Sequence, residues 1–280
     1  MKRILATLLF TSTTFLSAAA SADAPPWVDR HVVPNAPVAG SLDVGLGIGS
    51  RAFYAGPFSD RNTGIGFNLE GAISFARRVE IGLRVGIRAP FADRYAQSNY
   101  AQPDSFARPF DGNTLYDWTN GGNTISNPEV RVRGKLVETR VFELALEGRG
   151  YLPFGDGTRF ATLFSVPMQI HKGIFRADIN PGFVVGFYDP RFAFVFSVPV
   201  NLWFQVTPKV WLGPLLGFRA YDRSYYAGGT GSVDLIVGFG VGVSVTPFLD
   251  IKSQLLFPRI NSGTDWFGAG VALGFVFDPN

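Results

Sequence analysis

The chain has 280 residues and a nearly balanced charge, with 25 Lys and Arg against 22 Asp and Glu. This balance, with no basic stripe, argues against nucleic acid as a partner. Cysteine is absent, which excludes disulfides, thiolate metal ligands and a cysteine nucleophile.

The first residues predict a cleaved signal peptide over 1–22. Lys2 and Arg3 supply its positive start, residues 4–16 its apolar stretch and Ala20-Ser21-Ala22 its small-residue cleavage site. The apolar stretch is shorter than the roughly 20 residues that a membrane-spanning helix needs. A buried N-terminal helix, the alternative, does not account for the cleavage site.

After the signal peptide, a Pro-rich segment over residues 23–40 leads into a single domain over 41–277. The domain alternates apolar residues with polar residues or glycine, at the period of a β-strand. The alternation is clearest over 79–88, where Val, Ile and Leu occupy one face and Glu, Arg and Gly the other. Only 17% of the chain is charged, below the roughly 25% of soluble domains.

Dividing the domain by this alternation predicts twelve strands. Most have 10 to 15 residues, the length that a tilted strand needs to cross a bilayer. The predicted strands span 41–51, 63–76, 78–88, 128–137, 141–152, 159–171, 174–187, 191–206, 209–219, 231–245, 248–258 and 266–277.

The connections and the last strand point to one class of protein. Tight turns follow the even strands and mostly longer links follow the odd ones, the pattern of outer-membrane barrels, whose short turns are periplasmic. With its closing segment Val271-Ala272-Leu273-Gly274-Phe275-Val276-Phe277, the domain resembles Gram-negative outer-membrane β-barrels, the porin-like class. It departs from them in continuing with Asp278-Pro279-Asn280 after the last aromatic residue.

This resemblance implies an all-β fold, a transmembrane antiparallel up-and-down barrel of about 12 strands in the bacterial outer membrane. Residues 23–40 would then be periplasmic, and the partners would be membrane lipid and the barrel assembly machinery. A soluble β-sandwich or lipocalin-like barrel also alternates. We disfavour it because no amphipathic helix is present to cover so many apolar faces, whereas lipid can cover them.

The polar faces of the strands carry charges that we predict to line the lumen. Around the turn Glu138-Thr139-Arg140, the expected register places Lys135 opposite Glu143, Arg131 opposite Glu147 and Glu129 opposite Arg149. Such pairs could rigidify the barrel wall, or they could set a transverse field across a pore. The predicted lumen residues are Glu70, Glu80, Arg84, Arg88, Glu129, Arg131, Arg133, Lys135, Glu143, Glu147 and Arg149.

Glycines predict open space on another part of the lumen wall, because glycine has no side chain that could occupy the lumen. They occupy the inward positions of the predicted strands 231–245, 266–277 and 41–51. The link 89–127 is far longer than a hairpin needs, so we expect it to fold inward and constrict the lumen. The candidate constriction residues are Arg94, Tyr100, Arg108 and Trp118.

Catalysis, cofactors and metals are not expected. The two histidines, His31 and His171, are not placed for a lipid-facing Ser–His pair, and no metal-ligand spacing is present. Acidic residues in the long links are more typical of turns than of a protease pair or a calcium site. The sequence therefore favours a small passive channel for polar solutes. The alternative is a closed structural or surface-binding barrel without transport activity.

Overall fold

The computed structural model describes residues 30–55, 58–90, 128–152, 160–188, 191–221, 233–257, 260–262 and 267–277. Within these ranges the chain forms fourteen strands and one short 3-10 helix, η4 (Ile260–Ser262). The strands are β1 (Val38–Ala55), β2 (Phe58–Phe75), β3 (Val79–Pro90), β4 (Glu129–Glu138), β5 (Phe142–Tyr151), β6 (Ala161–Ser165), β7 (Met168–Lys172), β8 (Phe175–Ile179), β9 (Gly182–Tyr188), β10 (Arg191–Gln205), β11 (Val210–Tyr221), β12 (Val233–Thr246), β13 (Leu249–Phe257) and β14 (Phe267–Phe277).

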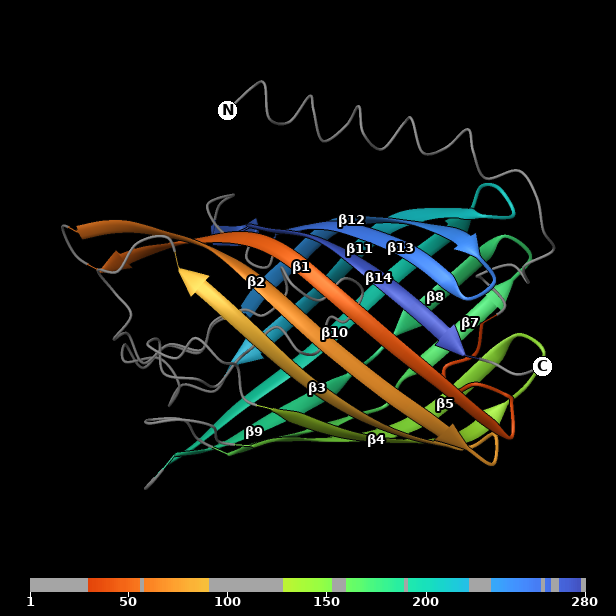
Figure 1. Ribbon diagram of the computed structural model, residues 1–280. Helices are drawn as coiled ribbons and strands as arrows, with labels where there is room; N and C mark the ends of the chain where they lie inside the picture. Colours follow the sequence, from red (N-terminus) through yellow and green to blue (C-terminus); the bar gives the residue numbers. More distant parts are fainter. Residues whose placement is uncertain are drawn as a thin grey trace.

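The strands close into one antiparallel barrel, in which β14 pairs with β1 and β10 pairs with β11 (Figure 1). β6 and β7 follow one another along β5, and β8 and β9 follow one another along β10. The fourteen strands therefore occupy twelve positions around the barrel. This architecture confirms the predicted transmembrane antiparallel up-and-down barrel of about twelve strands.

Prolines mark the two places where a barrel strand is interrupted. Pro167 separates β6 from β7, and Pro181 separates β8 from β9. Proline has no amide proton to donate, so the ladder is broken at each of them. The two breaks lie side by side, because the Val166 amide donates to the Pro181 carbonyl at 2.9 Å.

Burial in the barrel is reversed relative to a soluble sheet. On β3, Ile81, Leu83 and Ile87 are 47–55% exposed, whereas Glu80 and Arg84 are 5% exposed. The same contrast recurs around the barrel, which presents aliphatic and phenylalanine side chains outward. An apolar outer face fits a lipid environment. Among the described residues, no helix is long and apolar enough to cross a membrane.

The first hairpin is longer than the sequence predicted. β1 and β2 pair without interruption from Val38 with Phe75 to Ala55 with Phe58, so most of the predicted link 52–62 is strand. Main-chain hydrogen bonds hold this extension, and they do not depend on the alternation of side chains that the prediction followed. The predicted signal peptide, residues 1–22, lies outside the described residues.

The turn between β2 and β3 is as tight as predicted. Ala76 and Arg77 have φ of 51° and 63°, and the Arg78 amide donates to the Phe75 carbonyl at 3.1 Å. Two successive positive φ values and this hydrogen bond are typical of a type I′ turn, and Arg78 completes a three-residue loop between the paired residues Phe75 and Val79. The turn therefore fixes the register in which Glu70 lies opposite Arg84, as the sequence predicted.

Candidate functional site: the barrel lumen

The inner face of β2 to β5 is lined by charged side chains. Of the eleven predicted lumen residues, the structure describes the side chains of ten, and these ten lie on the face opposite the exposed apolar residues. Seven of the ten are buried, and Glu70, Arg131 and Arg133 are half-buried. The side chain of Arg88 and the loop candidates Arg94, Tyr100, Arg108 and Trp118 lie outside the described residues.

These charges form a continuous network of ion pairs. Arg131 contacts Glu70 at 2.5 Å and Glu80 at 2.8 Å, which joins β4 to β2 and β3. Further along the wall, Arg149 contacts Glu147 at 2.5 Å and Glu129 at 3.1 Å. Buried charges are tolerated when they are paired and hydrogen-bonded in this way. The network accounts for how so polar a wall can be buried.

The predicted register between β4 and β5 is wrong by two residues. Arg131 lies opposite Arg149 rather than Glu147, and the residue opposite Glu147 is Arg133, which contacts it at 2.5 Å. Lys135 lies opposite Ala145. The predicted opposite pairs Lys135–Glu143 and Arg131–Glu147 are therefore replaced by others. Glu129 lies opposite Tyr151 rather than Arg149, although Arg149 still contacts it at 3.1 Å.

The reason for this error lies in the turn and in a bulge next to it. The hairpin closes at Glu138 opposite Glu143, which makes the turn longer than predicted, and the register shifts again between Lys135 and Val137. Leu136 and Val137 are both exposed, as expected where a bulge adds one residue to a strand. The two shifts together displace the pairing of β4 with β5 by two residues, which is an even number. Because side chains alternate with a period of two, the charges remain on the inner face.

At Gly242 and Gly274 the glycine-lined part of the wall is filled, contrary to the sequence-based expectation of open space there. A Cβ added to Gly242 would lie 2.2 Å from the indole of Trp211, its cross-strand partner. Similarly, a Cβ on Gly274 would lie 2.8 Å from the carboxylate of Asp43 and the ammonium of Lys252. These glycines make room for large neighbours, a relation that the sequence of a single strand does not reveal.

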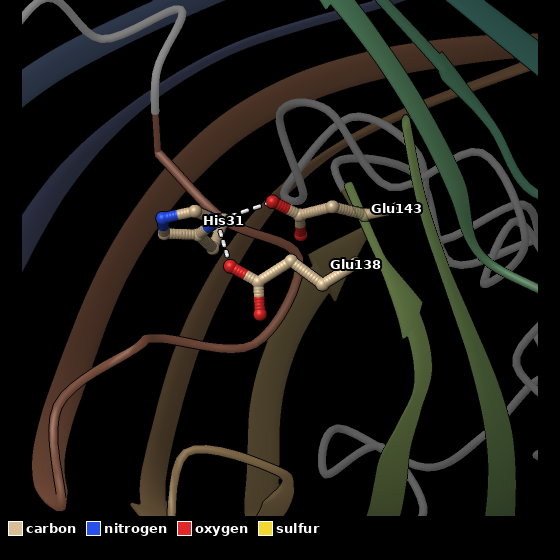
Figure 2. Close-up of side chains that lie close together, drawn as sticks. All are labelled: His31, Glu138 and Glu143. Carbon is tan, nitrogen blue, oxygen red and sulfur yellow. Dashed lines mark hydrogen bonds and ion pairs between the residues drawn. The ribbon is translucent and has the colours of Figure 1, made fainter. Parts of the chain in front are cut away.

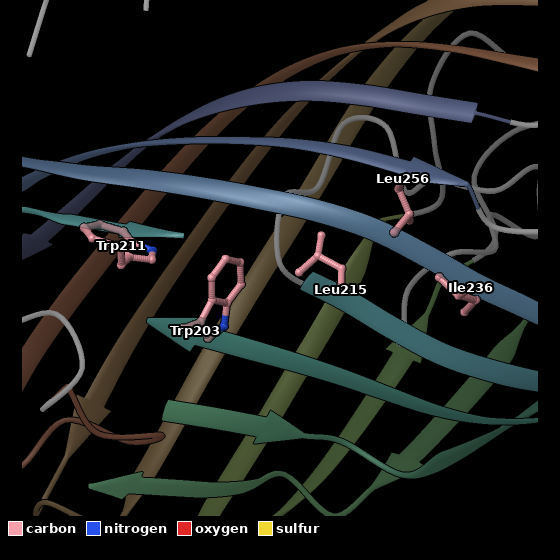
Figure 3. Close-up of a cluster of buried hydrophobic side chains, with 5 residues drawn as sticks. All are labelled: Trp203, Trp211, Leu215, Ile236 and Leu256. Atoms are coloured by element: carbon pink, nitrogen blue, oxygen red, sulfur yellow. The ribbon is translucent and has the colours of Figure 1, made fainter. Parts of the chain in front are cut away.

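An apolar patch lies next to these glycines on the inner side of the barrel. Figure 3 shows Trp203 of β10, Trp211 and Leu215 of β11, Ile236 of β12 and Leu256 of β13 as one cluster, and each is at most 5% exposed. The indole of Trp203 also donates to Asp178 of β8 at 3.1 Å. The lumen therefore has a charged wall on β2 to β5 and an aromatic and aliphatic patch on β10 to β13.

Residues 30–37, which we call the N-terminal strap, lie inside the barrel at the end where the short turns are. Arg30 forms an ion pair with Asp250 at the start of β13, while its carbonyl accepts hydrogen bonds from Gln169 of β7 and Arg176 of β8. In the twelve-position ring, β13 lies nearly opposite β7. Arg30, together with the side chains of Gln169 and Arg176, therefore bridges two nearly opposite parts of the barrel wall.

The rest of the strap follows the wall toward β1. The Val32 carbonyl accepts from Arg133 at 2.9 Å, and the Pro37 carbonyl accepts from the Ala76 amide at 2.9 Å. Val33 and Ala36 are fully buried or nearly so. The described part of the predicted periplasmic segment 23–40 packs against lumen charges, and β1 begins at Val38, before the predicted strand start at residue 41.

At the β4–β5 hairpin the strap meets two carboxylates (Figure 2). The Nδ1 atom of His31 contacts Glu143 directly and lies 3.6 Å from Glu138. The Val32 amide donates to Glu143 at 2.8 Å, and Asn35 contacts both Glu138 and Lys135. Sequence reasoning missed these contacts because the partners are about a hundred positions apart, with no spacing pattern to connect them.

Comparisons with known proteins support the fold. No protein-family model matches the chain, and no curated protein matches it by sequence. An outer membrane channel from Pseudomonas putida F1 superposes with a TM-score of 0.62 at 11% identity, covering 92% of this chain and 100% of that one. The NanC porin superposes with a TM-score of 0.53 at 9% identity, covering 85% of this chain and 100% of that one.

At such low identity the likeness concerns the fold. The fold is a channel-like barrel, and its exposed apolar belt fits a membrane rather than water. The expectation that the chain is not an enzyme stays a prediction. The likeness of fold and the lipid-compatible outer face together show that the chain has the fold of outer-membrane β-barrels such as these two proteins.

Proposed function

We propose that the chain is a small passive channel for polar solutes. The observation that carries this proposal is the charged inner wall of β2 to β5 in a barrel whose fold is that of outer-membrane channels. Barrels of about eight strands are filled by their own side chains, whereas barrels with many more strands enclose an aqueous channel. This barrel has twelve strand positions and keeps charged groups on the inside of four neighbouring strands.

The lumen walls suggest how a solute would be handled. Ionised side chains on one wall attract and orient polar groups, because facing charges create a field across a narrow pore. On the other side, the side chains around Trp203 and Trp211 are buried, so the half-buried charges Glu70, Arg131 and Arg133 are the groups that a solute would meet.

The link 89–127 is proposed as the constriction, as expected from its length. Deleting residues 95–124 should raise the single-channel conductance in planar bilayers, because a segment that fills part of the lumen would be removed. An equal conductance in the deletion variant would exclude the link as the constriction. If both proteins are silent, the channel proposal fails.

The charged wall should also set ion selectivity. Replacing Arg84, which is 5% exposed and contacts Glu129 at 3.2 Å, removes one positive charge from the lumen. Arg84→Ala should therefore shift the reversal potential in a salt gradient toward cation selectivity. Arg78→Ala, at an exposed position in the β2–β3 turn, makes the same change of charge outside the lumen and is the matched control. Equal shifts in both variants would mean that the charged wall does not face the conduction path.

The second candidate function is a closed structural or surface-binding barrel. The N-terminal strap favours it, because Arg30 binds Asp250 through its side chain and Gln169 and Arg176 through its carbonyl, and so links nearly opposite parts of the wall. The two candidates differ in conductance: a closed barrel is silent with its strap in place.

A further inference from the structure

We propose that His31, Glu138 and Glu143 bind a divalent transition metal ion of the Zn²⁺ type at the turn end of the lumen. The imidazole comes from the N-terminal strap and the carboxylates come from the β4–β5 hairpin, so the ion would fasten the strap to the barrel wall. One ligand atom from each residue lies within 4.8 Å of the others. In Figure 2 the two carboxylates point toward the same edge of the imidazole ring.

The charge around Glu143 is the first argument. Its side chain is fully buried, and a buried carboxylate needs a compensating cation. Carboxylates elsewhere on the inner face have one: Glu129 and Glu147 contact arginines, and Asp250 contacts Arg30. Among the described residues, the only basic side chain in contact with Glu143 is His31, and an imidazole is also a common metal ligand. A divalent cation held by both side chains would place a positive charge beside this buried carboxylate.

The hydrogen bonds behind the two carboxylates are the second argument. Glu143 turns one oxygen toward His31, and its other oxygen accepts from the Val32 amide at 2.8 Å. Glu138 accepts from Lys135 at 3.1 Å and from the side-chain amide of Asn35. Carboxylate ligands of metal ions are oriented in this way by a second layer of hydrogen bonds.

The donor set indicates which ions fit. One imidazole nitrogen and two carboxylate oxygens suit Zn²⁺ and similar transition metals, whereas Ca²⁺ and Mg²⁺ prefer sites made only of oxygen. Three protein ligands leave a coordination position for water. His31 and Glu138 are both about one-third exposed, so an ion can reach the site from the side of the turns. The proposal does not depend on solute transport, because an ion could bind whether or not the barrel conducts.

Titration of the folded, metal-free full-length mature barrel with ZnCl₂ in detergent tests this site by calorimetry. We expect one Zn²⁺ per chain, and no comparable binding of Ca²⁺ or Mg²⁺. His31→Ala and Glu143→Gln should each weaken Zn²⁺ binding by about 100-fold or more, since losing a ligand should cost at least as much as losing an outer-layer partner. The only other histidine of the chain provides the matched control, and His171→Ala should bind as the wild type does.

Three results would overturn the proposal: no binding of Zn²⁺, equal binding in the wild type and His31→Ala, or loss of binding in His171→Ala instead. Migration of unheated samples on gels checks that each variant is folded. Because His31 lies in the strap rather than in a strand, its replacement leaves every barrel ladder intact. Conductance recordings on the same samples are a separate measurement, so a silent barrel that binds Zn²⁺ would refute only the proposed channel.

Discussion

Deleting residues 23–36 from the mature chain is expected to raise the single-channel conductance several-fold. The strap brings main chain and side chains into the turn end of the barrel, where Val33 and Ala36 are fully buried or nearly so. Arg30 reaches from the β7–β8 side to Asp250 on β13. Conductance depends on the narrowest section of a pore, so removing material that crosses the lumen has a larger effect than changing any single wall residue.

Planar bilayer recordings of the deletion variant and the wild type, at the same salt concentration and voltage, measure this effect. Arg30→Gln breaks only the contact that crosses the lumen and should give a smaller increase. Arg77→Gln, an exposed turn residue, makes the same change of charge away from the lumen and should have no effect. A deletion variant that conducts like the wild type would show that the strap does not limit the pore. A silent wild type and an open deletion variant would identify the strap as a plug.

The fold could be predicted from the sequence because the alternation is unusually regular. A barrel in lipid needs an apolar outer face on every strand, and the polar faces are then left for the lumen. Over 79–88 this pattern is unbroken, and the structure exposes Ile81 and Leu83 while it buries Glu80 and Arg84. Strand number, order and the inner and outer faces all follow from that single constraint.

Register and lumen filling could not be predicted, because they depend on contacts between strands. The bulge at Leu136 changes which residues face each other without changing which residues face inward. The space that a side chain at position 242 would occupy is filled by Trp211 of the neighbouring strand. The positions of the glycines alone do not reveal this contact. The strap was missed for the same reason: nothing in a Pro-rich segment indicates that His31 will contact Glu143, 112 positions away.

Reversing Glu147 to Lys is expected to destabilise the barrel by about 3–5 kcal/mol, the cost of leaving buried charges without their partner. Glu147 is 3% exposed and contacts Arg133 of β4 and Arg149 of β5, both at 2.5 Å. A lysine at this position would place a third positive charge between the two arginines. The change therefore removes two ion pairs and adds repulsion at the same point.

A second substitution in β4 that restores the lost stability shows which β4 residue faces position 147. Arg133→Glu in the Glu147→Lys background should recover about 1–3 kcal/mol, as expected for residues in direct contact. Arg131→Glu makes the same change of charge two residues along the same strand, where the original side chain contacts Glu70 and Glu80, and should recover less than half as much. Urea unfolding in lipid vesicles, followed by tryptophan fluorescence, measures both couplings. A larger recovery with Arg131→Glu would show that β4 and β5 pair two residues away from the register described above, with Arg131 facing Glu147.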